Sequence, residues 1–209
     1  MVDYNMKEII KDCSFCNLDK TKIYNTVLDE TKYFYVTPTL GSLVEGYVLI
    51  ISKRHINSMS LLNKEELNEY KFLIRKYRNK FKNIYGKYPI IFEHGSPNLD
   101  DINKDNSVVH AHTHVVNHNY LNECDLINKL NFKLISKVED ISSNKNYIFY
   151  LNQNNMKYIS YDSKFISQFM RIEIAKDLNI LGKYNWKDYD FTNNIILTID
   201  KFNLFEKDI

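Results

Sequence analysis

The stretch Val108-Val109-His110-Ala111-His112-Thr113-His114-Val115-Val116 decides how this chain is interpreted. Histidine alternates with small or apolar residues, which is typical of a strand whose successive side chains point to opposite faces of a sheet. His110, His112 and His114 are therefore expected on one face, with neighbouring Cα atoms roughly 6–7 Å apart. The intervening residues would face a core.

Three imidazoles on one surface are groups that titrate near neutral pH, and they can exchange protons, bind a metal ion or attack phosphorus. One interpretation is an ordinary strand with solvated or hydrogen-bonded histidines, although polar groups seldom gather on one face without a partner. A second is a metal site built from all three histidines. The Asp of the familiar H-x-H-x-D-H pattern is missing, which weighs against it.

The segments around this strand predict an α+β fold. Residues 47–51, Tyr-Val-Leu-Ile-Ile, form an apolar run that is typical of a strand buried on both faces. Residues 63–85 predict the clearest helix, because apolar side chains recur at three- and four-residue spacing after the N-cap candidate Asn63. Gly86 is expected to end this helix.

The remaining segments give weaker patterns. Strands are expected at residues 23–28, 33–37 and 89–93, a loop at 95–106, and the histidine strand at 107–116. Beyond residue 119 we expect a hairpin formed by residues 146–151 and 156–161 around a polar turn, and an amphipathic helix at 165–179. Residues 193–202 are ambiguous. The chain is divided near residue 119, and its second half is expected to pack on the first.

The composition narrows the classes of function. The 209 residues carry a net charge of +2 and are 44% hydrophobic, which supports a core and argues against binding nucleic acid by bulk charge. No run approaches the ~20 apolar residues of a membrane helix, and the N-terminus lacks the apolar segment of a secretory signal, so the cytoplasm is the expected compartment. Among three cysteines, Cys13-x-x-Cys16 indicates metal or redox chemistry instead of a disulfide framework.

The motif His110-x-His112-x-His114-Val115-Val116 resembles the H-φ-H-φ-H-φ-φ signature of the histidine triad (HIT) superfamily. Residues 46–55, Gly-Tyr-Val-Leu-Ile-Ile-Ser-Lys-Arg-His, are similar to the family's strand and turn G-H-x-L-φ-φ-P-K-x-H. The pair Cys13-x-x-Cys16 resembles a zinc-binding branch, and Ser107 stands three residues before the first histidine, as in many relatives. The resemblance covers about residues 8–118.

This resemblance implies both a fold and an activity. Residues 1–118 would form a nucleotide-binding catalytic domain, an antiparallel sheet with the long helix packed on it, and residues 119–209 a C-terminal α/β extension. The enzyme would be a nucleoside phosphoramidate or dinucleoside polyphosphate hydrolase or nucleotidyltransferase. His112 would attack the α-phosphorus and form a nucleotidyl-histidine intermediate, with a backbone carbonyl holding its other nitrogen. His114 and Ser107 would assist at the phosphate and the leaving group.

The resemblance also implies a closed, structural Zn²⁺ site formed by Cys13, Cys16, His55 and His110. The alternative for the two cysteines is a surface or redox pair. The expected partner is a small nucleotide, and no membrane partner is expected. Because HIT relatives commonly dimerise, a homodimer is compatible with the resemblance, unless the extension covers that surface.

Departures from the family pattern leave alternatives open. Residues 96–106 contain no Gly, so a phosphate-cradling turn is missing there. Glu93, His94 and Asn106 are expected to contact the substrate instead. A catalytically weak nucleotide-binding module stabilised by zinc is one alternative function. A metallohydrolase that uses the three histidines as ligands is another.

Overall fold

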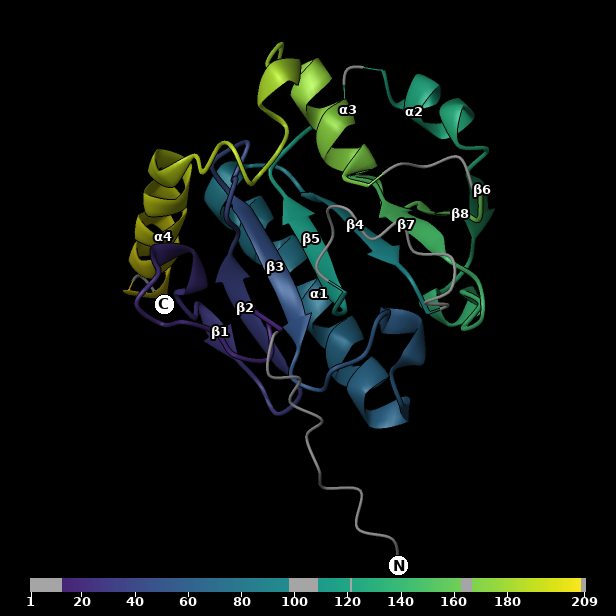
Figure 1. The fold of residues 1–209 in the computed structure, drawn as a ribbon, viewed down its shortest axis with the longest axis horizontal. Coiled ribbons are helices and arrows are strands. Elements are labelled where there is room, and N and C mark those ends of the chain that lie inside the picture. The colour runs from purple at the N-terminus through teal and green to yellow at the C-terminus, as the bar shows by residue number, and fades with distance from the viewer. Residues whose placement is uncertain (1–12, 98–108, 121, 163–166, 208–209) are drawn as a thin grey trace, which may run out of the picture.

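The strand that carries His112 and His114 lies in the middle of an antiparallel sheet (Figure 1). The computed structural model describes residues 13–97, 109–120, 122–162 and 167–207. Within them, eight strands follow the order β1-β2-β3-β5-β4-β7-β8-β6, and every pairing is antiparallel. The strands are β1 Asp29–Glu30, β2 Phe34–Pro38, β3 Tyr47–Ser52, β4 Ile90–Gly95, β5 His112–Val116, β6 Lys133–Ile135, β7 Tyr147–Leu151 and β8 Lys157–Ser160. The expected α+β class is confirmed.

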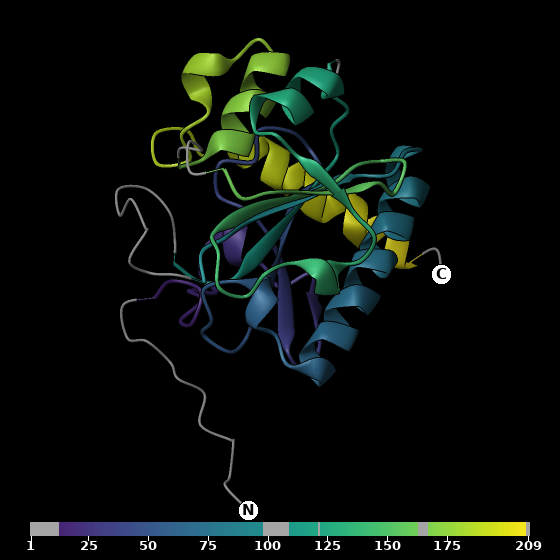
Figure 2. The same cartoon turned by 90° about the vertical axis from the view of Figure 1, so that its right-hand side faces the viewer.

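Helices cover both faces of this sheet (Figures 1 and 2). They are α1 Lys64–Tyr85, α2 Glu123–Lys129, α3 Phe169–Asp177 and α4 Thr192–Lys207. Residues of α1 and α4 share one buried apolar cluster with the sheet, and residues of α2 and α3 share a second cluster with its other face. Among the helices of the described residues, none has the length and apolar character that crossing a membrane requires.

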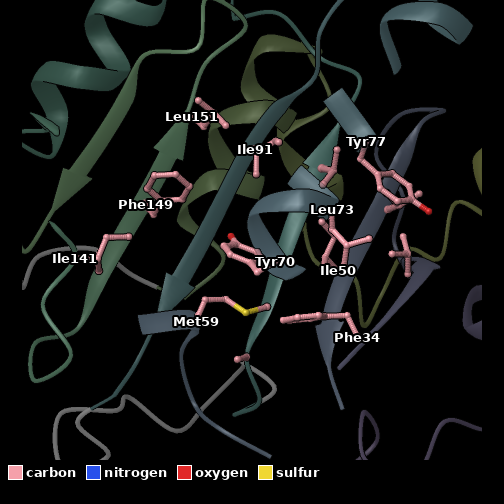
Figure 3. Packing of buried hydrophobic residues seen from close by; sticks show 14 of the residues in the cluster. Phe34, Ile50, Met59, Tyr70, Leu73, Tyr77, Ile91, Ile141, Phe149 and Leu151 are labelled. Carbon is pink, nitrogen blue, oxygen red and sulfur yellow. The ribbon is translucent and has the colours of Figure 1, made fainter. Parts of the chain in front are cut away.

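Strand β3 shows why the sheet needs cover on two sides. All six of its residues are buried, as the apolar run predicted. Val48 and Ile50 belong to the cluster under α1, whereas Leu49 and Ile51 belong to the cluster under α3. Figure 3 shows Ile50 close to Tyr70 and Leu73 of α1. Successive side chains of this one strand thus pack alternately into two cores.

Helix α1 begins and ends where the sequence predicted. The side chain of Asn63 accepts hydrogen bonds from the N–H groups of Glu65 and Glu66, and the Glu66 carboxylate accepts from the N–H of Asn63. Gly86 follows the last turn in the left-handed region, with φ of 72°. The helix buries the residues that recur on one face, Tyr70, Leu73, Tyr77 and Phe81.

The second half of the chain extends the same sheet. Strand β7 pairs with β4 along its whole length, and β7 and β8 form the predicted hairpin around residues 152–155. Asn155 adopts φ of 65° in that turn, which Asn tolerates better than most residues. The division near residue 119 therefore falls between strands of one sheet. Helix α4 adds Phe202 to the core under α1, at ring-centroid distances of 5.6 Å from Phe81 and 6.2 Å from Tyr77.

Several expected elements differ in the structure. Residues 23–28 were expected to form a strand, but the structure has a short 3₁₀ helix at Ile23–Asn25, closed by local bonds such as Thr26 N–H to Ile23 O. Helix α3 is not amphipathic, because Met170 through Ala175 are all buried between the sheet and neighbouring loops. The ambiguous segment 193–202 lies within α4. The histidine strand begins only at His112, since the N–H of Ala111 donates to Ile56 O and not to a strand partner.

Candidate functional site

A cavity of about 340 Å³ opens on the face of the sheet that α3 covers. Strand β5 places His112 and His114 in its wall, and β3 and β4 add Leu49 and Phe92, which pair with the same strand. The loop between the two cysteines and the first turn of α3 form further walls. His110 lines the cavity as well, so residues from both halves of the chain surround all three histidines.

The hydrogen bonds of His112 define its protonation. Its Nδ1 lies 2.7 Å from the carbonyl oxygen of His110. Because a carbonyl oxygen can only accept, Nδ1 carries the proton and Nε2 keeps its lone pair. Burial lowers the pKa of His112, while the bond to the His110 carbonyl raises it in part. The side chain is thus a neutral imidazole near pH 7, and the predicted carbonyl contact is confirmed.

His114 is held by aromatic neighbours. Its ring stacks on Phe92 with centroids 4.5 Å apart, and its Nδ1 lies 2.9 Å from the Tyr47 hydroxyl. Burial lowers the pKa of His114 well below its usual range, and its electrostatic interactions with His112, Arg171 and His94 lower it further. The rings of His112 and His114 are 4.8 Å apart between centroids, so both can reach one ligand group.

The other residues that were expected to contact the substrate do not all lie at the cavity. His94 lines the cavity, and burial lowers its pKa to about 4. Glu93 points to the opposite face, where its carboxylate accepts from the Met59 N–H at 2.7 Å and the Tyr147 hydroxyl at 2.6 Å. Burial raises the pKa of Glu93 to about 7. The structure does not bring Glu93 to the cavity. Asn106 and Ser107 lie outside the described residues.

Four side chains beside the cavity form a cluster that could hold a metal ion. One potential ligand atom from each of Cys13, Cys16, His55 and His110 lies within 4.8 Å of all the others. The Nδ1 atoms of His110 and His55 lie 3.3 Å from the thiols of Cys13 and Cys16 respectively, and Cys16 Sγ is 3.6 Å from His110 Nδ1. Tetrahedral bonds of typical Zn–S and Zn–N length place such atoms roughly 3.5 Å apart, so the spacing fits.

The protonation of His110 also fits metal binding. Its Nε2 lies 2.7 Å from the carbonyl oxygen of Ser52, so Nε2 carries the proton and Nδ1 presents its lone pair to the thiols. His110 is 2% exposed and belongs to the cluster, whereas His112 and His114 do not. The strand periodicity predicted three histidines on one face, and the family resemblance assigned His110 to the metal ligands and His112 and His114 to the reaction. In the structure all three line the cavity, and His110 also belongs to the cluster.

The cluster and the cavity share a wall. Phe15, which lies between the two cysteines in the sequence, packs its ring edge-on to His110 at 5.8 Å and to His112 at 5.1 Å between centroids. A metal ion held by the cysteines would therefore fix the loop that covers one side of His112.

Two further residues of the site, Arg171 and Trp186, were not among the site residues that the sequence predicted. Arg171 lies in the first turn of α3 and lines the cavity, where it donates to the carbonyl oxygens of Gly41 at 2.7 Å and Tyr184 at 3.1 Å. Trp186 packs close to Gly41, whose φ of 72° and missing side chain make room for both residues. The contacts of both residues with Gly41 join positions more than a hundred residues apart, and no local motif marks such contacts.

A family model described as "Protein similar to CwfJ C-terminal" matches residues 3–124, more than half of the chain. No curated protein matches.

Similar solved structures include a Hit-like protein involved in cell-cycle regulation from Bartonella henselae, at 15% identity and a TM-score of 0.36. That match covers 43% of this chain and 63% of the other, so this chain spans less than two thirds of that protein's length. A HIT family hydrolase from Clostridium thermocellum is 20% identical, with a TM-score of 0.39 and coverage of 54% and 95%. A histidine triad protein from Clostridium difficile is 18% identical, with a TM-score of 0.41 and the same coverage.

Family membership rests on the family-model match and not on these distant structural likenesses. The matched residues 3–124 include the whole Cys/His cluster and the strand with His112 and His114. The chain belongs to this family of proteins similar to the CwfJ C-terminal region.

Proposed function

We propose that the protein is a nucleotide hydrolase or nucleotidyltransferase that cleaves a phosphoanhydride or phosphoramidate bond at the α-phosphate through His112. The observation that carries this proposal is the 2.7 Å contact between His112 Nδ1 and the His110 carbonyl oxygen. It directs the unprotonated Nε2 away from the backbone, and a neutral imidazole is a competent nucleophile near pH 7. His112 also lines the cavity, so a substrate can reach it.

The proposed reaction has two displacements. In the first, Nε2 of His112 forms a bond to the α-phosphorus, and the bond between that phosphorus and the leaving group breaks. The leaving group departs with the bonding electron pair and takes up a proton. In the second, water, or another acceptor in a transferase, attacks the phosphorus, releases the nucleoside monophosphate unit and restores neutral His112. Dividing one displacement into two lowers the barrier of each.

Other residues have supporting roles in this proposal. His114 hydrogen-bonds the phosphate oxygens or the leaving group, with its ring position set by Tyr47 and Phe92. His94 contacts the substrate from β4. Ser107 and Asn106 keep the roles that the sequence predicts for them beside the leaving group and the substrate. Residues 1–118 supply this chemistry, and residues 119–209 complete the cavity.

We further propose that the metal is Zn²⁺ and that its role is structural. Two thiolates and two imidazoles suit tetrahedral Zn²⁺, and four protein ligands leave no open position for substrate. Such an ion would tie the Cys13–Cys16 loop to His110, two residues before β5. His112 and His114 stand outside the ligand set, which supports the covalent route over a metallohydrolase that uses all three histidines.

The experiment that tests this function is a turnover screen with adenosine phosphoramidate, diadenosine polyphosphates and nucleotide sugars. The wild-type protein, His112→Ala and a control variant, His118→Ala, would be compared. His118 pairs with Asp177 at 3.0 Å and does not line the cavity. We expect turnover of at least one substrate by the wild type and His118→Ala, and its loss in His112→Ala. Nucleotide binding without turnover of any substrate would instead support the catalytically weak binding module.

A further inference from the structure

The first turn of α3 forms a continuous part of the cavity wall. Gln168, Phe169, Met170 and Arg171 all line the cavity that contains His112 and His114. These residues belong to the second half of the chain and lie outside the matched residues 3–124. The nucleotide chemistry proposed for His112 does not use them, so their arrangement needs its own explanation.

Arg171 is a buried cation without an acidic partner among the described residues. Its side chain is 4% exposed and donates hydrogen bonds to the carbonyl oxygens of Gly41 and Tyr184. No ion pair joins it to a described carboxylate. It is also the single Lys or Arg side chain among the described residues that line the cavity. Buried charges are normally paired, so an anion bound in the cavity would complete this site.

The start of helix α3 provides a second, independent feature. The helix has nine residues, and its N-cap residue Gln168 makes no capping hydrogen bond with its side chain. Gln168 has φ of 61°, an uncommon value for a residue other than Gly. The first N–H groups of a helix lack partners within the helix and carry partial positive charge, so they favour anions.

The contacts of Arg171 relate it to the reaction centre. Its guanidinium lies 5.7 Å from the centroid of the Tyr47 ring, and the Tyr47 hydroxyl lies 2.9 Å from His114 Nδ1. His114 in turn neighbours His112. Arg171 is thus on the His114 side, with two side chains between it and His112. This position suits a substrate group other than the phosphate that His112 attacks.

We propose that Arg171 and the first turn of α3 form an anion subsite that binds a phosphate group of the substrate beyond the α-phosphate. Resting on the function proposed above, this makes the preferred substrate a nucleotide with an anionic leaving group, such as a dinucleoside polyphosphate. An amine leaving group, as in a phosphoramidate, has no negative charge for Arg171 to bind.

Inorganic pyrophosphate tests the anion subsite without any turnover. Its affinity would be measured by isothermal titration calorimetry for wild type, Arg171→Gln, Arg171→Lys and the control Arg78→Gln. Arg78 is also buried and also donates to two carbonyl oxygens, those of Asn152 and Gln153, but it does not line the cavity. We expect binding about 10- to 100-fold weaker in Arg171→Gln, a smaller loss in Arg171→Lys, and no change in Arg78→Gln.

Two results would overturn the anion subsite: no pyrophosphate binding by the wild type, or wild-type affinity in Arg171→Gln. If Arg171→Gln does not fold, by circular dichroism, Arg171→Lys decides the question, because it keeps the charge and loses the forked geometry. In that case, two results together would contradict the subsite. Folded Arg171→Lys would bind pyrophosphate as tightly as the wild type does, and raising the salt concentration would not weaken its binding.

Turnover tests the substrate class. The ratio of kcat/KM for diadenosine tetraphosphate to that for adenosine phosphoramidate should fall about 10-fold or more in Arg171→Gln. An equal loss for both substrates would show that Arg171 does not select the leaving group and would overturn this assignment. If the wild type cleaves neither substrate, the proposed function fails, while the pyrophosphate titration still decides whether the anion subsite exists.

Discussion

His110 and His112 are joined by a hydrogen bond in which the Nδ1–H of His112 donates to the His110 carbonyl oxygen across 2.7 Å. The imidazole of His110 belongs at the same time to the Cys/His cluster. One residue therefore links the Cys/His cluster to the proposed nucleophile, through its ring on one side and its backbone on the other. Loss of the proposed metal should disturb the orientation of His112, although the proposal gives the metal no part in the reaction.

The first prediction concerns metal content. Wild-type protein should contain about one zinc ion per chain by elemental analysis, and Cys13→Ser should lose most of it because one of four ligands is gone. Turnover and melting temperature should fall with the metal. The control is Cys124→Ser, since Cys124 is exposed and outside the cluster. Full metal content in Cys13→Ser, or its loss in His112→Ala and His114→Ala, would contradict the ligand assignment.

The second prediction concerns the partner of His114. Tyr47→Phe removes the hydroxyl that lies 2.9 Å from His114 Nδ1, so kcat should fall about 5- to 10-fold, the equivalent of one hydrogen bond. Tyr70→Phe is a matched control, because its hydroxyl bonds Thr113 Oγ1 at 2.8 Å on the opposite face of the same strand. Each variant should lose about 1 kcal/mol of stability in urea unfolding. A kcat that falls equally in both variants would mean that the Tyr47 hydroxyl has no specific role.

The third prediction is a pH dependence of stability that originates at Glu93. Burial raises the pKa of Glu93 from its ordinary 4.5 to about 7 in the folded protein. The protonated carboxyl is then favoured in the folded state, so its contribution is fully present below about pH 4.5 and is lost as pH rises through about 7. The loss amounts to about 3 kcal/mol.

Glu93→Gln isolates this effect because the amide is uncharged and has similar size. Its Oε1 can accept from the Met59 N–H, and its Nε2 can donate to the Tyr147 hydroxyl, which in turn lies 2.9 Å from Ser58 Oγ. Between pH 4.5 and 8, urea unfolding should show the variant gaining about 3 kcal/mol of stability relative to wild type. Parallel stability curves for the two proteins would refute the proposed titration.

The fourth prediction tests whether the C-terminal helix is part of the main core. Phe202 of α4 is 1% exposed and packs on Phe81 and Tyr77 of α1. Phe202→Ala should cost about 3–5 kcal/mol because it leaves a cavity in that core. Leu204→Ala, in the same helix, should cost less than about 0.5 kcal/mol because Leu204 is 59% exposed. Similar costs for the two variants would indicate that α4 contributes little to the core.

The parts of the fold that were predictable from sequence have local causes. Helix α1 carries its start signal in Asn63, its stop in Gly86 and its buried face in a regular spacing. Strand β3 is an uninterrupted apolar run. The strand predicted at residues 23–28 was wrong. Ile23 is 39% exposed, and the residues around it form a 3₁₀ turn with one another instead of pairing with a strand.

Only those parts of the site that carry a local sequence motif were predictable. The histidine alternation and the C-x-x-C pair identified the residues around the cavity and the cluster. Contacts that join distant segments left no local pattern. Examples are Arg171 with Gly41, Tyr47 with His114, and His118 with Asp177 of α3.

The measurement that tests the central claim most directly is mass spectrometry of protein quenched at alkaline pH during turnover of an adenylated substrate. The account predicts an adenylyl adduct that peptide mapping places on His112, present in wild type and His118→Ala and absent from His112→Ala. Turnover with no adduct at His112, together with wild-type rates in His112→Ala, would contradict it.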